Sequence, residues 1–318
     1  MKQKEPVDIP VYLFVGFLDS GKTRFIQETL EDPRFNSDGK TLLLLCEEGE
    51  CEYSPDQFAC SDVYVETLED KSEFSSGNLD RLLKKNGCTR VIIEYNGMWL
   101  VSDLMRDMPA DWVVYQCFFF ADARSILSYN ANMRQLVYDK LQYCELAVFN
   151  RFSAGTDKME LHKMVRGVTR RADIAYESPD GSVSYDDIED PLPFDIDAPI
   201  INIEDRDYAL WYRDMAEELK KYEGKTVRFT GLVTRSKKLP PDSYVIGRRV
   251  MTCCEADIRY MGLICIGGPV QPERGAWMDI TARIAIKWHK AYGKRGPVLT
   301  VLGAQPASVP EPEVATFY

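Results

Sequence analysis

The sequence contains only two histidines, His162 and His289, among 318 residues. Histidine-rich metal sites and Ser-His or Cys-His catalytic arrangements therefore lack support. His162 lies in a polar helical segment and His289 lies among lysines, so we expect both side chains to be exposed. No apolar run reaches the roughly 18 residues that a membrane-spanning helix needs, and residues 1–6 lack the apolar segment of a secretory signal. These absences predict a cytoplasmic protein that does not itself span a membrane.

Positive charge is in deficit, because 39 lysines and arginines face 50 acidic residues and the net charge is −11. This balance argues against nucleic-acid binding by the whole protein. The charge is uneven, however, since residues 224–296 carry fourteen basic and five acidic residues. This basic stretch meets the acidic remainder of the chain, faces an anionic partner, or is simply a solvated surface.

Nine cysteines, an odd number with several in apolar runs, indicate reduced thiols rather than a disulfide framework. Cys253 and Cys254, together with Asp257 and Cys265, could bind Zn²⁺ or another soft metal through thiolates. Adjacent residues of a strand point to opposite faces, so two such cysteines do not easily share one ion. Buried thiols are the favoured alternative.

Residues 16–23, GFLDSGKT, match the phosphate-binding P-loop pattern G-x-x-x-x-G-K-[ST]. The apolar residues 11–15 before the motif predict a buried strand, and Phe25, Ile26 and Leu30 after it share one face of a predicted helix. Strand, loop and helix thus follow one another in the order that a nucleotide site requires.

The chemistry of this loop predicts a role for each of its residues. Gly16 and Gly21 let successive backbone N–H groups point at a phosphate on the helix N-terminus. Lys22 supplies a cation for the β- and γ-phosphates, and the Thr23 hydroxyl is a ligand for Mg²⁺. The two intervening residues predicted to contribute to nucleotide binding are Asp19 and Ser20.

Acidic residues follow two further predicted strands. Residues 41–46 form a buried strand before the acidic loop 47–52, and residues 90–94 form a strand that ends in Glu94, as in a Walker-B arrangement. The carboxyl ends of such strands line the ligand crevice. Glu48, Glu50 or Glu94 is therefore expected to orient water, with Lys22 as the catalytic cation and Glu94 also beside Mg²⁺. Solvated charges are the alternative for the acidic loop.

The alternation of strands and helices predicts an α/β domain with a mainly parallel sheet. Further strands are predicted at 113–120 and 146–150, around a helical stretch at 125–143. Residues 173–207 then carry twelve acidic residues, one arginine and four prolines, which is unsuited to a packed core and suited to a domain boundary. We expect a nucleotide-binding domain over 1–199 that ends in this linker.

Residues 200–318 are expected to form a smaller all-β domain behind a helix at 208–222. Short alternating segments with glycine-rich bends predict an OB-like barrel, and a β-sandwich is the alternative. The predicted strands are 227–233, 249–253, 262–266, 278–286 and 298–302.

The loop GFLDSGKT closely resembles the G-F-L-G-[SA]-G-K-T loop of the CobW/HypB/UreG class of P-loop GTPases, many of which deliver metals. Residues 48–50 resemble the N-E-F-G-E segment of that class, residues 93–97 its I-E-x-x-G segment, Asp122 the aspartate of V-D-A, and residues 149–151 the start of N-K-x-D. The resemblance implies Mg²⁺-dependent binding and hydrolysis of GTP, with ATP as the alternative, and contacts to the base from Asn150 and Arg151.

Three departures from the class affect its chemistry. Arg151 replaces the lysine that stacks along the base, and its planar guanidinium could do the same. The C-x-C-C metal motif would fall near residues 71–75, where there is no cysteine. The carboxylate that reads guanine is replaced by Ser153, which leaves base selectivity open, with Asp157 as a substitute.

The second domain resembles the C-terminal domain of YcgQ-like proteins, which accompany a permease of the YcgR type. The resemblance rests on residues 222–226, 231–233, 253–257 and 262–263. Two hypotheses follow. The chain is a Mg²⁺-dependent GTP-binding protein and GTPase that is regulatory or linked to metal homeostasis, or it is a nucleotide-sensing accessory subunit of a permease with little or no hydrolysis.

Overall fold

Strand β1 (Ile9–Gly16) and helix α1 (Lys22–Glu31) flank the P-loop in the computed structural model, as the sequence predicts. The structure describes residues 8–35, 39–59, 62–235, 239–240, 243–252, 257–268 and 271–317. The chain divides into unit 1, Met1–Ile188, and unit 2, Glu189–Tyr318, so the division falls inside the acidic segment 173–207. Among the described residues, no helix combines the length and the apolar character needed to cross a bilayer.

The other elements of unit 1 follow in chain order. They are β2 (Thr41–Leu45), η1 (Pro55–Gln57), β3 (Val63–Thr67), η2 (Lys71–Glu73), α2 (Ser76–Asn86), β4 (Arg90–Glu94), α3 (Val101–Asp107), β5 (Trp112–Asp122), α4 (Ile126–Asn132), α5 (Arg134–Leu141), β6 (Leu146–Asn150), α6 (Lys158–Arg166), β7 (Asp173–Glu177) and β8 (Val183–Tyr185).

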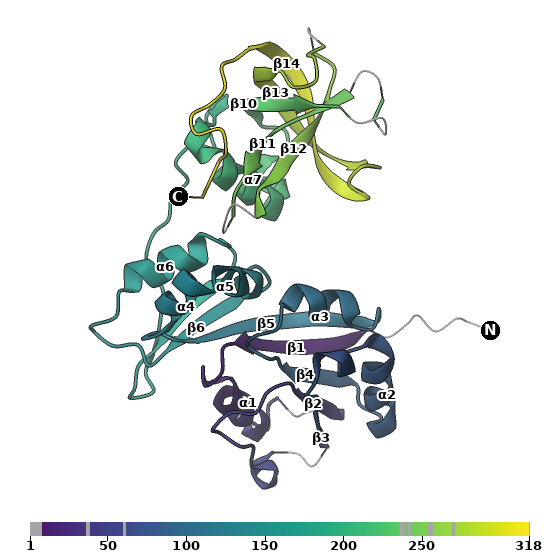
Figure 1. Ribbon diagram of the computed structural model, residues 1–318, viewed down its shortest axis with the longest axis vertical. Coiled ribbons are helices and arrows are strands. Elements are labelled where there is room, and N and C mark those ends of the chain that lie inside the picture. Colours follow the sequence, from purple (N-terminus) through teal and green to yellow (C-terminus); the bar gives the residue numbers. More distant parts are fainter. Residues whose placement is uncertain are drawn as a thin grey trace, which may run out of the picture. The chain divides into compact units, whose positions relative to one another are not determined.

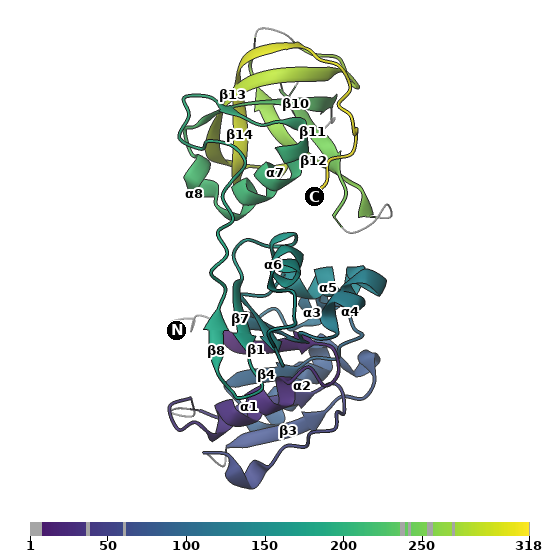
Figure 2. The same ribbon diagram turned by 90° about the vertical axis from the view of Figure 1, so that its left-hand side faces the viewer.

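The strands of unit 1 form one eight-stranded sheet in the order β3-β2-β4-β1-β5-β6-β7-β8 (Figure 1). Neighbouring strands pair in parallel up to β7, and β8 is antiparallel at the edge beside it (Figure 2). The prediction of a mainly parallel α/β sheet is confirmed. The carboxyl ends of β1, β2, β4, β5 and β6 consequently meet along one rim, where the P-loop lies.

Alternate residues of β1 pack on opposite faces of the sheet. Val11, Leu13 and Val15 join a core that helices α2–α6 cover, whereas Phe14 packs with Ile26 of α1 on the other face. The strand is buried on both sides, which explains its continuous apolar run.

The sheet is larger than the five strands predicted for this domain. Strands β3, β7 and β8 were not expected, and β7 lies in the segment described as unsuited to a core. That interpretation is wrong for Ile174, Ala175 and Tyr176, which are at most 3% exposed. The stretch predicted as one helix over 125–143 is interrupted at Met133, where the backbone leaves the helical region and separates α4 from α5.

Unit 2 contains its own core. Its elements are β9 (Ile201–Asn202), η3 (Asp205–Asp207), α7 (Tyr208–Glu217), α8 (Leu219–Tyr222), β10 (Thr226–Thr234), β11 (Ser243–Val250), β12 (Arg259–Ile266), β13 (Trp277–His289) and β14 (Lys294–Pro306). The helix predicted over 208–222 is interrupted at Glu218. Trp211, Met215 and Tyr222 pack in the core of this unit.

Strand β10 pairs with both β11 and β13, so five strands close a ring in the order β10-β11-β12-β14-β13. The pairings are antiparallel except for β12 with β14. The smaller all-β domain is therefore confirmed. The strand predicted at 249–253 overlaps β11 only at Arg249 and Val250, because β11 begins at Ser243, and residue 253 lies outside the described residues.

Candidate functional site

The P-loop backbone depends on its two glycines. Gly16 and Gly21 have φ angles of 148° and 94°, and Asp19 also has a positive φ of 56°. A Cβ atom on Gly16 would lie 2.1 Å from the Phe120 carbonyl oxygen, and one on Gly21 would lie 2.5 Å from the Asn150 amide nitrogen. Strands β5 and β6 thus approach the loop so closely that only glycine fits.

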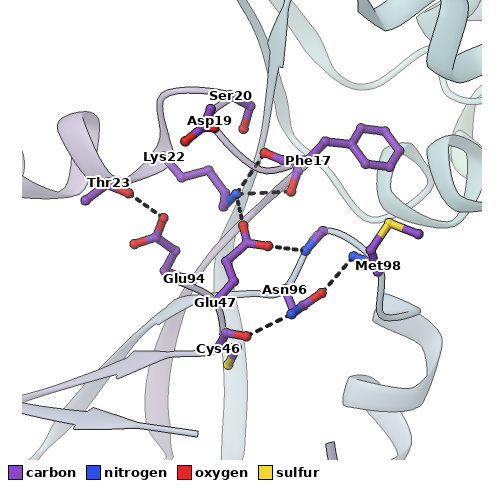
Figure 3. Close-up of polar contacts among 12 residues, drawn as sticks. Phe17, Asp19, Ser20, Lys22, Thr23, Cys46, Glu47, Glu94, Asn96 and Met98 are labelled. Atoms are coloured by element: carbon purple, nitrogen blue, oxygen red, sulfur yellow. Dashed lines mark hydrogen bonds and ion pairs between the residues drawn. The ribbon is translucent and has the colours of Figure 1, made fainter. Parts of the chain in front are cut away.

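Lys22 turns back into the loop that precedes it. Its Nζ donates to the carbonyl oxygens of Gly16, at 3.1 Å, and Phe17, at 3.0 Å, and forms an ion pair with Glu47 (Figure 3). The Lys22 side chain is 2% exposed and that of Glu47 is 10% exposed. The second Glu47 oxygen accepts from the backbone N–H of Gly97 at 2.9 Å. Glu47 therefore connects the P-loop lysine to the loop after β4.

Glu47 was not among the residues singled out from the sequence. The acidic run after β2 predicts a carboxylate near the phosphates. In the structure, the first residue of that run, Glu47, is the one that pairs with Lys22. Glu48 and Glu50 are exposed. The Glu50 backbone N–H donates to Asp19 Oδ1 at 3.3 Å, and Glu50 lines the cleft described below. The roles of Glu48 and Glu50 in orienting water stay predictions.

Thr23 and Glu94 are brought together at the start of α1. The Thr23 hydroxyl donates to Glu94 Oε1 at 2.7 Å, and the other Glu94 oxygen accepts from the Tyr53 hydroxyl. Glu94 is 4% exposed. Burial, followed by the nearby Glu94 carboxylate, raises the pKa of Tyr53, so this phenol stays protonated and donates.

The loop after β4 is fixed from the other side by Asn96. Its amide nitrogen donates to the Cys46 carbonyl oxygen at 3.0 Å, and its side-chain oxygen accepts from the Met98 N–H at 2.8 Å (Figure 3). The ends of β2 and β4 are thereby joined, and Gly97 is held against the P-loop.

The two residues expected to contact the base, Asn150 and Arg151, follow β6. Asn150 is 5% exposed and its amide donates to the Ser20 carbonyl oxygen. Arg151 has a φ of 54°, and its guanidinium donates to the Asp19 carbonyl oxygen at 3.1 Å and to Asp122 at 3.0 Å. Both residues therefore attach the P-loop to neighbouring strand ends.

Asp122, at the end of β5, is paired with two arginines. Its hydrogen bond with the Arg124 side chain, followed by that residue's backbone N–H and the charges of both arginines, lowers the pKa of the Asp122 carboxyl. The carboxylate stays charged and holds Arg151 at the cleft.

A cleft of about 550 Å³ opens beside the P-loop. This volume suits a small-molecule ligand. The lining residues come from the P-loop and α1, the loop after β2, and the ends of β5, β6 and β7. They are Asp19, Gly21, Thr23, Arg24, Glu50, Cys51, Arg124, Asn150, Arg151, Ser153, Glu177, Ser178 and Pro179.

The described residues fit a nucleotide phosphate and a magnesium ion. Ser20 is 3% exposed, and its hydroxyl has no hydrogen-bond partner among the residues that the structure describes. A buried polar group without a partner is costly, and a phosphate oxygen would satisfy this one. Thr23 and Glu94 together supply the hydroxyl and carboxylate oxygens that Mg²⁺ prefers.

The structure does not test the hypothesis that Cys253 and Cys254 bind a soft metal ion. Cys253 and Cys254 lie outside the described residues. Within the described part of the chain, no group of three or more His, Cys, Asp or Glu side chains is arranged to hold a metal ion. Cys265 is fully buried among apolar residues, and this burial raises the pKa of its thiol.

The prediction that both histidines are exposed is wrong. His162 is 4% exposed, and its Nδ1 lies 2.8 Å from an Asp186 oxygen whose partner oxygen accepts from the Tyr176 hydroxyl. His289 is half-buried. His162 lies on the buried face of α6. Its neighbours in the sequence include polar residues, and for that reason the sequence suggests an exposed side chain.

Unit 1 has a P-loop NTPase fold, because a P-loop joins a central parallel strand to a helix and an acid from the adjacent strand β4 faces the loop's threonine. Residues 185–314, most of unit 2, match the model of the family described as the DUF1980 C-terminal domain. This match agrees with the predicted resemblance of the second domain to a separate family. Among curated proteins, none matches the sequence.

The solved structures that are similar to the chain include the following three. Zn(II)-bound YjiA GTPase from E. coli shares 14% identity, covering 84% of this chain and 90% of its own, with a TM-score of 0.41. A Zn(II)-bound triple mutant of YjiA shares 13% identity over 80% and 89%, with a TM-score of 0.43. The hydrogenase maturation factor HypB from Archaeoglobus fulgidus shares 16% identity over 54% and 82%, with a TM-score of 0.35.

Proposed function

We propose that unit 1 binds a nucleoside triphosphate with Mg²⁺, preferring GTP, and hydrolyses it slowly as a regulatory GTPase of the CobW type. The observation that carries the proposal is the arrangement of Lys22, Thr23 and Glu94 around a P-loop with two obligatory glycines. The link to metal homeostasis rests on the motifs shared with a class that includes many metal-delivery proteins.

Binding would replace contacts that the protein makes with itself. Lys22 would exchange its ion pair with Glu47 for the β- and γ-phosphates, and the Ser20 hydroxyl would gain the partner it lacks. The backbone N–H groups of the loop would donate to the phosphate at the N-terminus of α1. These groups are fixed before binding, so they need little reorganisation to stabilise developing negative charge.

Thr23 and Glu94 would hold the magnesium ion from one side, Thr23 through its hydroxyl and Glu94 directly or through water. When bound, Mg²⁺ supplies charge neutralisation on the phosphate oxygens. Release of Lys22 also frees Glu47, whose second oxygen bonds to Gly97 N–H. The ion pair thus couples phosphate binding to the loops after β2 and β4, which is how the nucleotide would act as a switch.

The proposal is tested with Lys22→Ala. Because the ammonium is the only cation that the P-loop motif itself supplies to the phosphates, the variant is expected to lose nucleotide-dependent thermal stabilisation and hydrolysis. Lys84→Ala is the matched control, since Lys84 is exposed on α2 and pairs with Asp80. Unchanged GTP binding by Lys22→Ala, measured by calorimetric titration with Mg²⁺, would remove the basis of the proposal.

A second function is a nucleotide-sensing accessory subunit of a permease of the YcgR type, with little or no hydrolysis. The replacement of the base-reading carboxylate by Ser153 and the missing cysteine motif favour it. Phosphate release by the purified protein, with and without Zn²⁺, separates the two functions. Sustained turnover favours the enzyme, and tight binding without turnover favours the sensor.

A further inference from the structure

Glu177, at the end of β7, lines the cleft beside the P-loop. Glu177 ends β7, the strand paired beside β6, which ends at Asn150. The backbone N–H of Phe152 donates to the Glu177 carbonyl oxygen at 2.9 Å. Glu177 lines the same cleft as Asn150, Arg151 and Ser153. A carboxylate of β7 therefore lines the same cleft as the two residues predicted to contact the base.

The residue expected to replace the missing base-reading carboxylate is used elsewhere. Asp157 is the N-cap of α6, where its side chain accepts from the Glu160 N–H at 3.1 Å. Asp157 does not line the cleft, whereas Ser153 does. A serine hydroxyl has one proton and cannot act as a purely accepting group with two oxygens.

We propose that Glu177 reads the base and selects guanine, an inference that rests on the nucleotide binding proposed above. Guanine presents two neighbouring donors, N1–H and the N2 amino group, and an ionised carboxylate accepts at both of its oxygens. Adenine presents a donor beside the N1 lone pair, which would face a carboxylate oxygen. The base-reading function is thus transferred from the loop after β6 to the end of β7.

The ion pair between Arg24 and Glu177 fits this role. Arg24, on α1, contacts Glu177 Oε1 through one guanidinium nitrogen. The Glu177 side chain is 16% exposed and that of Arg24 is 55% exposed. Arg24 also lies 3.6 Å from Glu28 on the same helix, so it has a second partner when a base engages the carboxylate. The ion pair holds the Glu177 side chain beside Arg24, and both residues line the cleft.

The test compares the affinities of GTP, ITP, XTP and ATP, each with Mg²⁺, for the full chain by calorimetric titration. The wild type is expected to bind GTP at least about tenfold tighter than ITP, which lacks the N2 amino group, because a hydrogen bond to a charged group is lost. ATP should bind more weakly still. Equal affinities for GTP and ITP would overturn the inference without any variant.

Glu177→Gln makes the test specific. The amide offers one acceptor and one donor, which suit the N1–H and O2 of xanthine, so we expect GTP affinity to fall about 10- to 100-fold and XTP affinity to rise. Asp157→Asn is the matched control, because asparagine also caps helices well, and its GTP preference should equal that of the wild type. A GTP-to-ATP ratio that Glu177→Gln leaves unchanged, or that Asp157→Asn abolishes, would overturn the assignment.

The outcome for the base is separable from that for the phosphates. If the wild type binds GTP, ITP and ATP equally tightly, the P-loop proposal stands and the role of Glu177 is wrong. If it binds no triphosphate, both fail.

Discussion

Lys140 is a fully buried lysine on α5 whose ammonium donates to the Trp99 carbonyl oxygen at 3.1 Å. Burial lowers the pKa of Lys140 to about 8, compared with roughly 10.4 in an unfolded chain. Between these two pH values the folded state binds fewer protons than the unfolded state, so the free energy of unfolding rises with pH. The cost of burying the charge is present in full below about pH 8 and is lost progressively as the pH rises to roughly 10.4.

We therefore expect the wild type to gain stability relative to Lys140→Met as the pH rises. The difference in free energy of unfolding should shift by about 2 kcal/mol in favour of the wild type between pH 7 and pH 10. Urea unfolding of both proteins at several pH values measures it. Lys84→Met, at an exposed position on α2, is the control that should show no such gain. A difference independent of pH would mean that Lys140 has the same pKa in the folded and the unfolded states.

Among single residues, Glu47 illustrates why some residues of the site can be predicted from the sequence and others cannot. The P-loop residues are specified by spacing, because each role follows from its place in an eight-residue motif. The acidic run after β2 offers several adjacent carboxylates, and spacing does not decide which of them points at Lys22. Which carboxylate contacts Lys22 depends on the path of the backbone after β2. Glu47 is therefore identified by its contacts with Lys22 and Gly97, and not by its position in the sequence.

Among the elements, the loop between β4 and α3 is positioned by a contact that only glycine allows. A Cβ atom on Gly97 would lie 2.8 Å from Phe17 Cα and 2.9 Å from the Gly16 carbonyl oxygen. Gly97→Ala should push this loop away from the P-loop and lengthen the hydrogen bond to Glu47. Overpacking of this kind costs about 1–3 kcal/mol, so we expect a lower melting temperature and weaker GTP binding.

The control for this prediction is Gly77→Ala. Gly77 lies in α2, and a Cβ atom there would meet nothing within 4 Å. Alanine in a helix is favoured over glycine by roughly 0.5–1 kcal/mol, so this variant should be as stable as the wild type or slightly more stable. Wild-type GTP affinity in Gly97→Ala would show that the loop does not need its close approach.

The strands differ in how clearly the sequence pattern predicts them. Strands buried on both faces, such as β1, β2 and β4, read as apolar runs between turns and were predicted close to their observed bounds. Strand β3 is a short edge strand, and β7 contributes three buried residues inside a segment dominated by acids and prolines. Their place in the sheet is decided by pairing with β2 and β6, which periodicity does not encode. Glu177, the residue proposed to read the base, belongs to β7, so the sequence pattern does not predict its place beside β6.

At the scale of the whole molecule, the proposed site and the second family match occupy different units. The P-loop, its acids and the cleft belong to unit 1, whereas the closed ring of strands and its core belong to unit 2. Each unit has a core of its own, so each has the basis for a separate unfolding transition.

Scanning calorimetry of the full chain should therefore resolve two transitions, of which Mg²⁺ with GTP raises only one. At a free nucleotide concentration of 100 times Kd, ligand binding stabilises the native state by about 2.7 kcal/mol, which corresponds to roughly 5–10 °C for a domain the size of unit 1. In Lys22→Ala, addition of the same nucleotide should shift neither transition. If nucleotide instead raises both transitions of the wild type together, unfolding of the two units is coupled, and nucleotide binding in unit 1 then changes the stability of unit 2 as well.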